Sequence, residues 1–337
     1  MAANNTTTTN KTQIAVRVNC TLTVEQDQIL NWVPIGLSTL IMLCQVFNVS
    51  VFHVWRNREP FVLFHISLCY SSLILGINSF INPICRMVPW NWTTQMVAKA
   101  AVVSYGIINR VCVINTLLIS VDRWVSVEFA VFYRNFMTHR RSRIIAAVTW
   151  TVALAITVPG IAVYHSGVIV SCNRPSNMNF RINGTAGEPW QVFLAFVAKG
   201  PYFIPLLFLF QARILMVAVM TRLRMNRMRQ VMRVGPNVVN SRRLTRARMA
   251  VNLVWNNLAG SMVVVLGTVL ANIPYNVLEF TGLNRGDAAV ALLKLQNYLF
   301  IVQYLYTPAA YMIFFPLYRA VVYRPFRAVA RVWKKPR

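Results

Sequence analysis

The sequence predicts an all-α membrane protein, a seven-transmembrane helix bundle that ends in a short amphipathic C-terminal helix. The first observation is composition: 56% of the 337 residues are hydrophobic and only 12% are charged, as in chains that dissolve in lipid. The second is length, because a bilayer core of roughly 30 Å takes about 20 apolar residues as helix. The third is the distribution of basic residues and glycosylation sequons between the apolar blocks.

Seven apolar blocks define the predicted spans, and they lie near 29–54, 60–84, 95–127, 144–168, 190–220, 249–281 and 289–314. Residues 1–28 are expected to form an extracellular glycosylated tail. They include Asn, Thr and charges but no apolar signal core, so the first span is expected to act as the insertion signal. Residues 315–337 are expected to form a cytoplasmic amphipathic helix and basic tail, which Pro325 kinks or divides.

The basic residues predict the orientation. The formal net charge of +26 would suggest nucleic acid in a soluble protein. Here, however, 22 of the 34 basic residues fall in the first, third and fifth connections and the C-terminal tail. The positive-inside rule makes that side the cytoplasm. Membrane lipids are therefore the expected partner of the basic loop and tail, in preference to nucleic acid or to a specific protein contact.

Glycosylation sequons and cysteines agree with this orientation. Six Asn-x-Ser/Thr sequons fall in segments predicted to be extracellular, at Asn4, Asn5, Asn10, Asn19, Asn91 and Asn183; a seventh, at Asn48, lies inside the first span and should be unmodified. Cys20, Cys85 and Cys172 are also predicted to be extracellular, where disulfides persist. We expect a bridge between Cys85 and Cys172, with a pair that uses Cys20 as the alternative.

A set of spaced motifs then resembles the rhodopsin-like G-protein-coupled receptors. Asp122-Arg123-Trp124 ends the third span as Asp-Arg-Tyr does in that family, and Trp150 follows Arg123 by 27 residues. Thr307-Pro308-Ala309-Ala310-Tyr311 resembles Asn-Pro-x-x-Tyr of the seventh span. Further matches are Asn48 and Val51 in the first span, Pro205 in the fifth, Pro274 in the sixth and Tyr318-Arg319 at the start of the amphipathic helix.

A narrower resemblance is to odorant receptors, and within them to divergent fish-type receptors. The stretch DRWVSVEFAVFYRNFMT matches their pattern at Asp122, Arg123, Val125, Tyr133, Met137 and Thr138. Glu59-Pro60 resembles the pair that precedes their second span. The resemblance implies an odorant or chemosensory receptor at the plasma membrane, with an extracellular N-terminus, that binds a small ligand and activates a heterotrimeric G protein.

The family's activation residues carry over to six positions, which are Asp122, Arg123, Trp124, Pro274, Pro308 and Tyr311. In the family the acid holds the arginine at rest, and an outward swing of the sixth helix exposes the arginine to the G protein. An arginine at the membrane edge is costly unless it is paired. A snorkelling arginine that only marks the interface is the plainer alternative.

Several residues depart from the family pattern, among them Phe47, Glu128 and Ala130, which stand where Gly, Cys and Pro are usual. Trp124 replaces Tyr, Thr307 replaces Asn, and Asn272 stands two residues before Pro274, where a toggle tryptophan is usual. Ser72 falls where relatives keep the Asp of a sodium site. Allosteric sodium is therefore not expected, and no cofactor is implied.

Polar residues of the third span predict a ligand pocket in the outer half of the bundle. Tyr105, Asn109 and Arg110 share one stripe of a helix, and Arg110 lies about 20 Å outward from Arg123 at 1.5 Å per residue. Lys199, Tyr275, Glu279 and Lys294 complete the expected site. Only Glu279 among the eight acids is placed to offset these cations, so one hypothesis is an anionic or strongly hydrogen-bonding ligand. The alternative is that Arg110 only braces neighbouring helices.

Several other functions are disfavoured. An amine receptor needs an Asp where this chain has Tyr105, and an opsin needs a lysine where it has Ile301. Enzyme motifs and clusters of metal ligands are absent from the sequence, and the four histidines are scattered, so no catalytic or metal site is expected. A seven-helix protein that binds ligand without signalling, and a ligand-gated channel or transporter, are the remaining alternatives.

Overall fold

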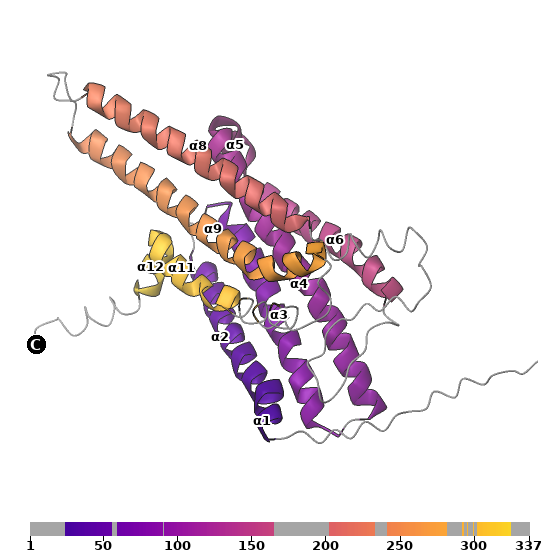
Figure 1. Ribbon diagram of the computed structural model, residues 1–337. Helices are drawn as coiled ribbons and strands as arrows, with labels where there is room; N and C mark the ends of the chain where they lie inside the picture. The colour runs from indigo at the N-terminus through magenta and orange to yellow at the C-terminus, as the bar shows by residue number, and fades with distance from the viewer. Residues whose placement is uncertain are drawn as a thin grey trace, which may run out of the picture.

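The computed structural model describes residues 24–55, 59–89, 91–164, 202–232, 241–281 and 302–324, with Leu292, Leu295 and Leu299 as isolated positions, and over these residues its regular structure is helical (Figure 1). The elements in chain order are α1 (Val24–Asp27), the π-helical η1 (Gln28–Trp32), α2 (Val33–Val54), α3 (Val62–Met87), α4 (Trp92–Glu128), α5 (Ala130–Phe136), α6 (His139–Tyr164), α8 (Phe203–Met232), α9 (Ser241–Thr281), α11 (Thr307–Phe314) and α12 (Pro316–Val322). The long helix α4 is central, since it contacts α3, α6, α8 and α9.

Six of the predicted spans fall on described helices that are long and apolar enough to cross a membrane. These stretches are Val33–Val54, Val62–Met87, Trp92–Glu128, His139–Pro159, Phe203–Met220 and Trp255–Leu278. Residues 165–168 of the fourth predicted span and 190–201 of the fifth lie outside the described residues. The seventh span is described from Val302, with a break at Tyr306 before α11 begins at Thr307.

Among the described helices, α8 and α9 extend furthest beyond the predicted spans. The predicted fifth span ends at 220 and the sixth begins at 249, but α8 continues to Met232 and α9 begins at Ser241. Figure 1 shows α8 and α9 side by side, extending beyond the other helices. Arg and Met are good helix formers, so the helix need not stop where the apolar block stops. The third connection also contains a helix that hydropathy alone does not predict, α5.

The described part of the bundle buries polar side chains among apolar ones and exposes large apolar side chains. Leu43, Leu209 and Ile313 are 63% exposed, whereas Asn48 and Asn115 are completely buried. A soluble protein rarely buries amides while it exposes large apolar side chains along whole helices. This pattern suits lipid around the bundle and hydrogen bonding within it.

Hydrogen bonds between helices fix the bundle at the level of Trp150. The Trp150 indole Nε1 donates to Ser67 Oγ at 2.8 Å, and Ser67 Oγ donates to Asn115 Oδ1 at 3.0 Å. Asn115 Nδ2 in turn donates to Ser71 Oγ at 3.3 Å. This chain of bonds joins α6, α3 and α4, so α4 is held in register with two neighbours between its two candidate sites.

Candidate functional site

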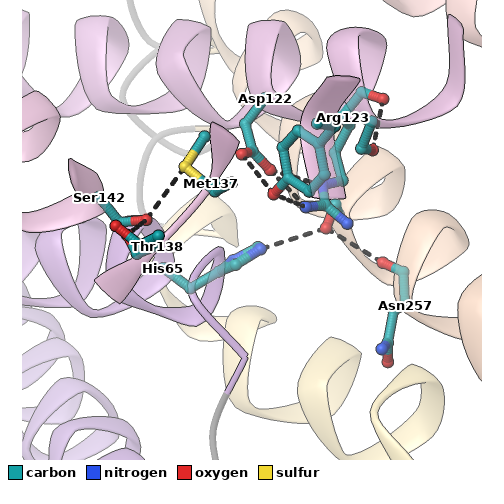
Figure 2. A network of polar contacts seen from close by, with 10 residues as sticks. His65, Asp122, Arg123, Met137, Thr138, Ser142 and Asn257 are labelled. Atoms are coloured by element: carbon teal, nitrogen blue, oxygen red, sulfur yellow. Dashed lines mark hydrogen bonds and ion pairs between the residues drawn. The ribbon is translucent and has the colours of Figure 1, made fainter. Parts of the chain in front are cut away.

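Arg123 is held at the end of α4 by an acid and a phenol. Its guanidinium forms an ion pair with Asp122, with Arg123 Nε donating to Asp122 Oδ2 at 2.8 Å. Arg123 Nη2 also donates to the Tyr133 hydroxyl at 3.1 Å, and that hydroxyl donates to Asp122 Oδ1 at 2.8 Å. Asp122 is 4% and Arg123 7% exposed, and Figure 2 shows the two side chains facing each other. The three residues thus form a closed polar ring, in which Asp122 and Arg123 are buried and Tyr133 is partly buried.

Tyr133 comes from α5, the helix of the third connection. Burial raises the pKa of its hydroxyl above the usual value, and the Asp122 carboxylate raises it further against the opposing effect of Arg123. The phenol therefore keeps its proton at physiological pH and can donate to Asp122. The odorant-receptor pattern includes Tyr133, but sequence reasoning gave it no role.

The other side of Arg123 rests on α3 and its neighbours. The guanidinium carbon lies 4.1 Å from the centre of the Phe61 ring, a cation–π distance. One turn along α3, the buried His65 contacts Tyr311 Oη through Nδ1 at 3.1 Å and Ser261 Oγ through Nε2 at 3.1 Å. His65 therefore links α3 to α11 and α9, and Figure 2 shows this link running on to Asn257.

Tyr311 and Thr307 lie where the seventh span meets α2. Gln45 Nε2 donates to Thr307 Oγ1 at 3.1 Å, and Asn48 Nδ2 donates to the same oxygen at 3.3 Å. The Tyr318 hydroxyl of α12 donates to Asn48 Oδ1 at 2.8 Å. Thr307, although smaller than the Asn of the family, thus accepts from two amides of α2. Pro308 lies in the first turn of α11, and Pro274 is buried inside α9.

Two departures from the family pattern contact each other at the same end of the bundle. The Trp124 indole Nε1 donates to Glu128 Oε2, four residues on. Arg213 of α8 donates to the same carboxylate through Nη2 at 2.6 Å and Nε at 3.2 Å. The Trp124 ring also packs against Phe210 of α8, with centroids 5.4 Å apart. We call Trp124, Glu128 and Arg213 the clamp, because they join α4 to α8.

The clamp predicts a coupled, salt-sensitive contribution to stability. We expect Glu128→Gln and Arg213→Gln each to lower the thermal unfolding midpoint modestly, since the ion pair is partly exposed. The loss should shrink in high salt, which screens exposed charges. Thermal unfolding of the purified single and double variants at two salt concentrations tests this prediction. The double variant should be at least as stable as the less stable of the two single variants. Additive losses would show that the two residues act independently.

The residues predicted to line the ligand pocket are only partly described. Asn109 is buried, and its Oδ1 accepts from the Tyr304 hydroxyl at 3.3 Å. Arg110 is half-buried and interacts electrostatically with Tyr202 at the start of α8. Tyr105 is partly buried against the main core. Tyr275 and Glu279 belong to α9, but their side chains lie outside the described set, as do Lys199 and Lys294.

The predicted modification sites are also partly described. Asn91 is exposed and caps α4: its Oδ1, not the Nδ2 that a glycan would occupy, accepts from Thr94 N at 2.9 Å. Asn4, Asn5, Asn10, Asn19 and Asn183 lie outside the described residues. Cys85 is buried against Ala98 and Val102 of α4. Its predicted partner Cys172 is not described, nor is Cys20, so the bridge stays a prediction.

Comparison with known proteins finds a solved structure with a similar fold. The chain is similar to the crystal structure of squid rhodopsin, with a TM-score of 0.56 over 89% of this chain and 87% of that chain, at 18% sequence identity. No protein-family model and no curated protein matches the sequence. The prediction of an all-α, seven-helix membrane bundle is confirmed. The chain is a multi-pass membrane protein with a rhodopsin-like fold.

Proposed function

We propose that the chain is a chemosensory G-protein-coupled receptor, of odorant-receptor type, that binds a small ligand near Tyr105 and activates a heterotrimeric G protein near Arg123. The observation that carries this proposal is the closed ring of Asp122, Arg123 and Tyr133 at one end of α4. A cation that only marked the interface would reach toward the headgroups. Arg123 is instead 7% exposed and turned into the bundle.

The proposed activation step opens the ring toward the G protein. Arg123 is bound at rest by the carboxylate, the phenol and the Phe61 ring. A movement of α9 away from α4 exposes the guanidinium, and a G protein that binds only this open form shifts the population toward it. In this proposal the Arg123 end faces the cytoplasm, the glycosylated N-terminus lies outside, and the receptor sits in the plasma membrane.

The direct test is nucleotide exchange by purified heterotrimeric G protein in the presence of the receptor in lipid nanodiscs. A panel of small acids, amino acids, bile acids and steroids is applied, with Arg123→Ala as the matched control. We expect at least one compound to accelerate exchange with the parent chain and not with Arg123→Ala. Ligand-evoked current without a G protein would instead indicate a channel.

The ligand side of the proposal depends on Arg110. Within the membrane zone a guanidinium requires a polar or charged partner, and Arg110 interacts electrostatically with Tyr202, the residue before α8. We propose that an anionic or strongly hydrogen-bonding ligand engages Arg110, with Asn109 and Tyr105 beside it. The competing role is a brace between α4 and α8.

Arg110→Gln separates these two roles. If Arg110 binds the ligand, we expect ligand potency to fall at least tenfold while surface expression is kept, because Gln retains hydrogen bonding but not charge. Calcium responses through a promiscuous G protein, with surface expression measured in the same cells, provide the readout. Unchanged potency with poor surface expression would establish the brace.

A specific observation supports one alternative, a protein that binds ligand without signalling. Asn272 stands at the place of the toggle tryptophan, and its Nδ2 donates to Thr268 O of its own helix at 2.8 Å. A ligand then has no large ring there to displace. Ligand binding that leaves nucleotide exchange unchanged in the panel above would favour this alternative.

A further inference from the structure

His65 lies inside an apolar span, yet both nitrogens of its ring have polar partners. The side chain is only 1% exposed. Its Nδ1 lies 3.1 Å from the Tyr311 hydroxyl of α11, and its Nε2 lies 3.1 Å from Ser261 Oγ of α9. One imidazole on α3 therefore contacts two other helices. The ring nitrogen that carries the proton determines the direction of both hydrogen bonds.

The Ser261 hydroxyl determines where that proton lies. Its own proton is donated to Asn257 O, one turn earlier in α9, at 3.0 Å (Figure 2), so Ser261 Oγ faces His65 as an acceptor. His65 Nε2 must then carry a proton and donate it to Ser261. In a neutral ring Nδ1 has no proton, and it accepts from the Tyr311 hydroxyl. The two hydrogen bonds thus run in one direction, from Tyr311 through His65 to Ser261.

The surroundings of the ring disfavour a second proton. A buried imidazolium is costly unless an acid lies beside it. The Phe61 ring packs edge-on to His65 with centroids 6.0 Å apart, and the Arg123 guanidinium carbon lies 4.1 Å from the centre of the same Phe61 ring. Among the described residues, the charged group that acts on the imidazole is therefore a cation, because the Asp122 carboxylate is bound to Arg123. His65 stays neutral.

We propose that neutral His65 is a latch, a positioning residue that holds α9 and the seventh span against α3 in the resting arrangement. The proposed activation step moves α9 away from α4. Because α3 packs against α4, the same movement separates Ser261 from His65 and breaks their hydrogen bond. The role of the latch in activation rests on the proposed function, whereas the restraint on α9 needs no G protein.

Nitrogen NMR of the full chain in lipid nanodiscs tests the protonation of the latch directly. Histidine is isotope-labelled, and the signals of His65 are those that disappear in His65→Leu. If that variant does not fold, Ser261→Ala identifies the ring instead, because it removes the acceptor of Nε2 and shifts that signal. We expect a proton on Nε2 and none on Nδ1. A proton on Nδ1, alone or together with one on Nε2, would overturn the proposal.

Two conservative variants separate the two hydrogen bonds of His65. The amide nitrogen of Gln reaches the place of Nε2 and can donate to Ser261, whereas the amide oxygen of Asn lies near the place of Nδ1 and can accept from Tyr311. Opening of the bundle is measured without a G protein, as the distance between spin labels on the exposed Asn256 of α9 and Ile144 of α6. The labels are attached through unnatural amino acids.

The latch predicts which variants open the bundle. We expect the population with the longer label distance to grow about fivefold in His65→Asn and Ser261→Ala, as for the loss of one internal hydrogen bond, and to stay at the parent level in His65→Gln. No change in Ser261→Ala, or growth in His65→Gln as large as in His65→Asn, would overturn the proposal. The expected pattern in a parent chain that never stimulates nucleotide exchange would support the latch and exclude the proposed function.

Discussion

Under the proposed function, replacing Asp122 with Asn is expected to raise ligand-independent nucleotide exchange and to lower the thermal stability of the protein. The introduced amide is isosteric with the carboxylate but uncharged, so the guanidinium of Arg123, 7% exposed, loses its counter-ion. Removing one partner of a buried ion pair costs about 3–5 kcal/mol. The Tyr133 hydroxyl and the Phe61 ring still contact Arg123 and should reduce that loss. Because the resting state alone is penalised, the open form gains population.

Tyr133→Phe is the matched control for this prediction. It removes one donor to Asp122 and one acceptor for Arg123 but keeps the ion pair, so basal exchange should rise less than with Asp122→Asn. Exchange is measured with purified G protein, and stability by thermal unfolding of the same samples. Basal exchange that stays at the parent level in Asp122→Asn, although the variant is less stable, would show that the ring has a structural role only.

The fold was largely predictable because hydropathy and membrane thickness constrain it. Each described span matches an apolar block, and the buried Asn48, which is a sequon by sequence, is hydrogen-bonded to Tyr318 in the interior as its position in the first span requires. The ends of α8 and α9 were not predictable in this way. Hydropathy indicates which residues lie within the lipid, whereas a helix ends where helix propensity falls or a capping residue occurs.

The candidate site was predictable from the sequence only where its residues are close together in one helix. Asp122 and Arg123 are neighbours in sequence, so their pairing follows from one helix. His65, Tyr311 and Ser261 meet only through tertiary packing, although a histidine inside an apolar span was a signal that a polar partner exists.

The clamp shows how two residues that depart from the family pattern can be compatible with each other. Taken singly, Trp124 and Glu128 each weakened the likeness to the family pattern. They are four residues apart, which places them on one helix face, and Arg213 in the next span but one supplies the counter-charge. The i, i+4 spacing was visible in the sequence. The choice of Arg213 among 34 basic residues required the packing of α8 on α4.

The second large effect is expected at Gly267, where α9 and the seventh span are in close contact. The Tyr306 hydroxyl donates to Val264 O at 2.7 Å and lies 3.1 Å from Val263 O. It reaches these carbonyls across Gly267, and a Cβ there would overlap both the hydroxyl and the ring. Alanine normally stabilises a helix interior over glycine by about 1 kcal/mol. Here overpacking, which typically costs about 1–3 kcal/mol, should reverse that sign.

We therefore expect Gly267→Ala to lower the thermal unfolding midpoint of the purified chain and to be neutral or stabilising in a Tyr306→Ala background, where the obstructing ring is gone. Gly36→Ala is the matched control, since a Cβ at that helical glycine of α2 meets nothing within 4 Å, and it should cost no stability. Equal losses from Gly267→Ala in both backgrounds would show that Tyr306 is not what requires the glycine. If the predicted coupling is observed, the hydrogen bonds from Tyr306 that hold the seventh span to α9 require a residue without a side chain at position 267. The helix α9 is also the one whose movement the proposed activation step requires.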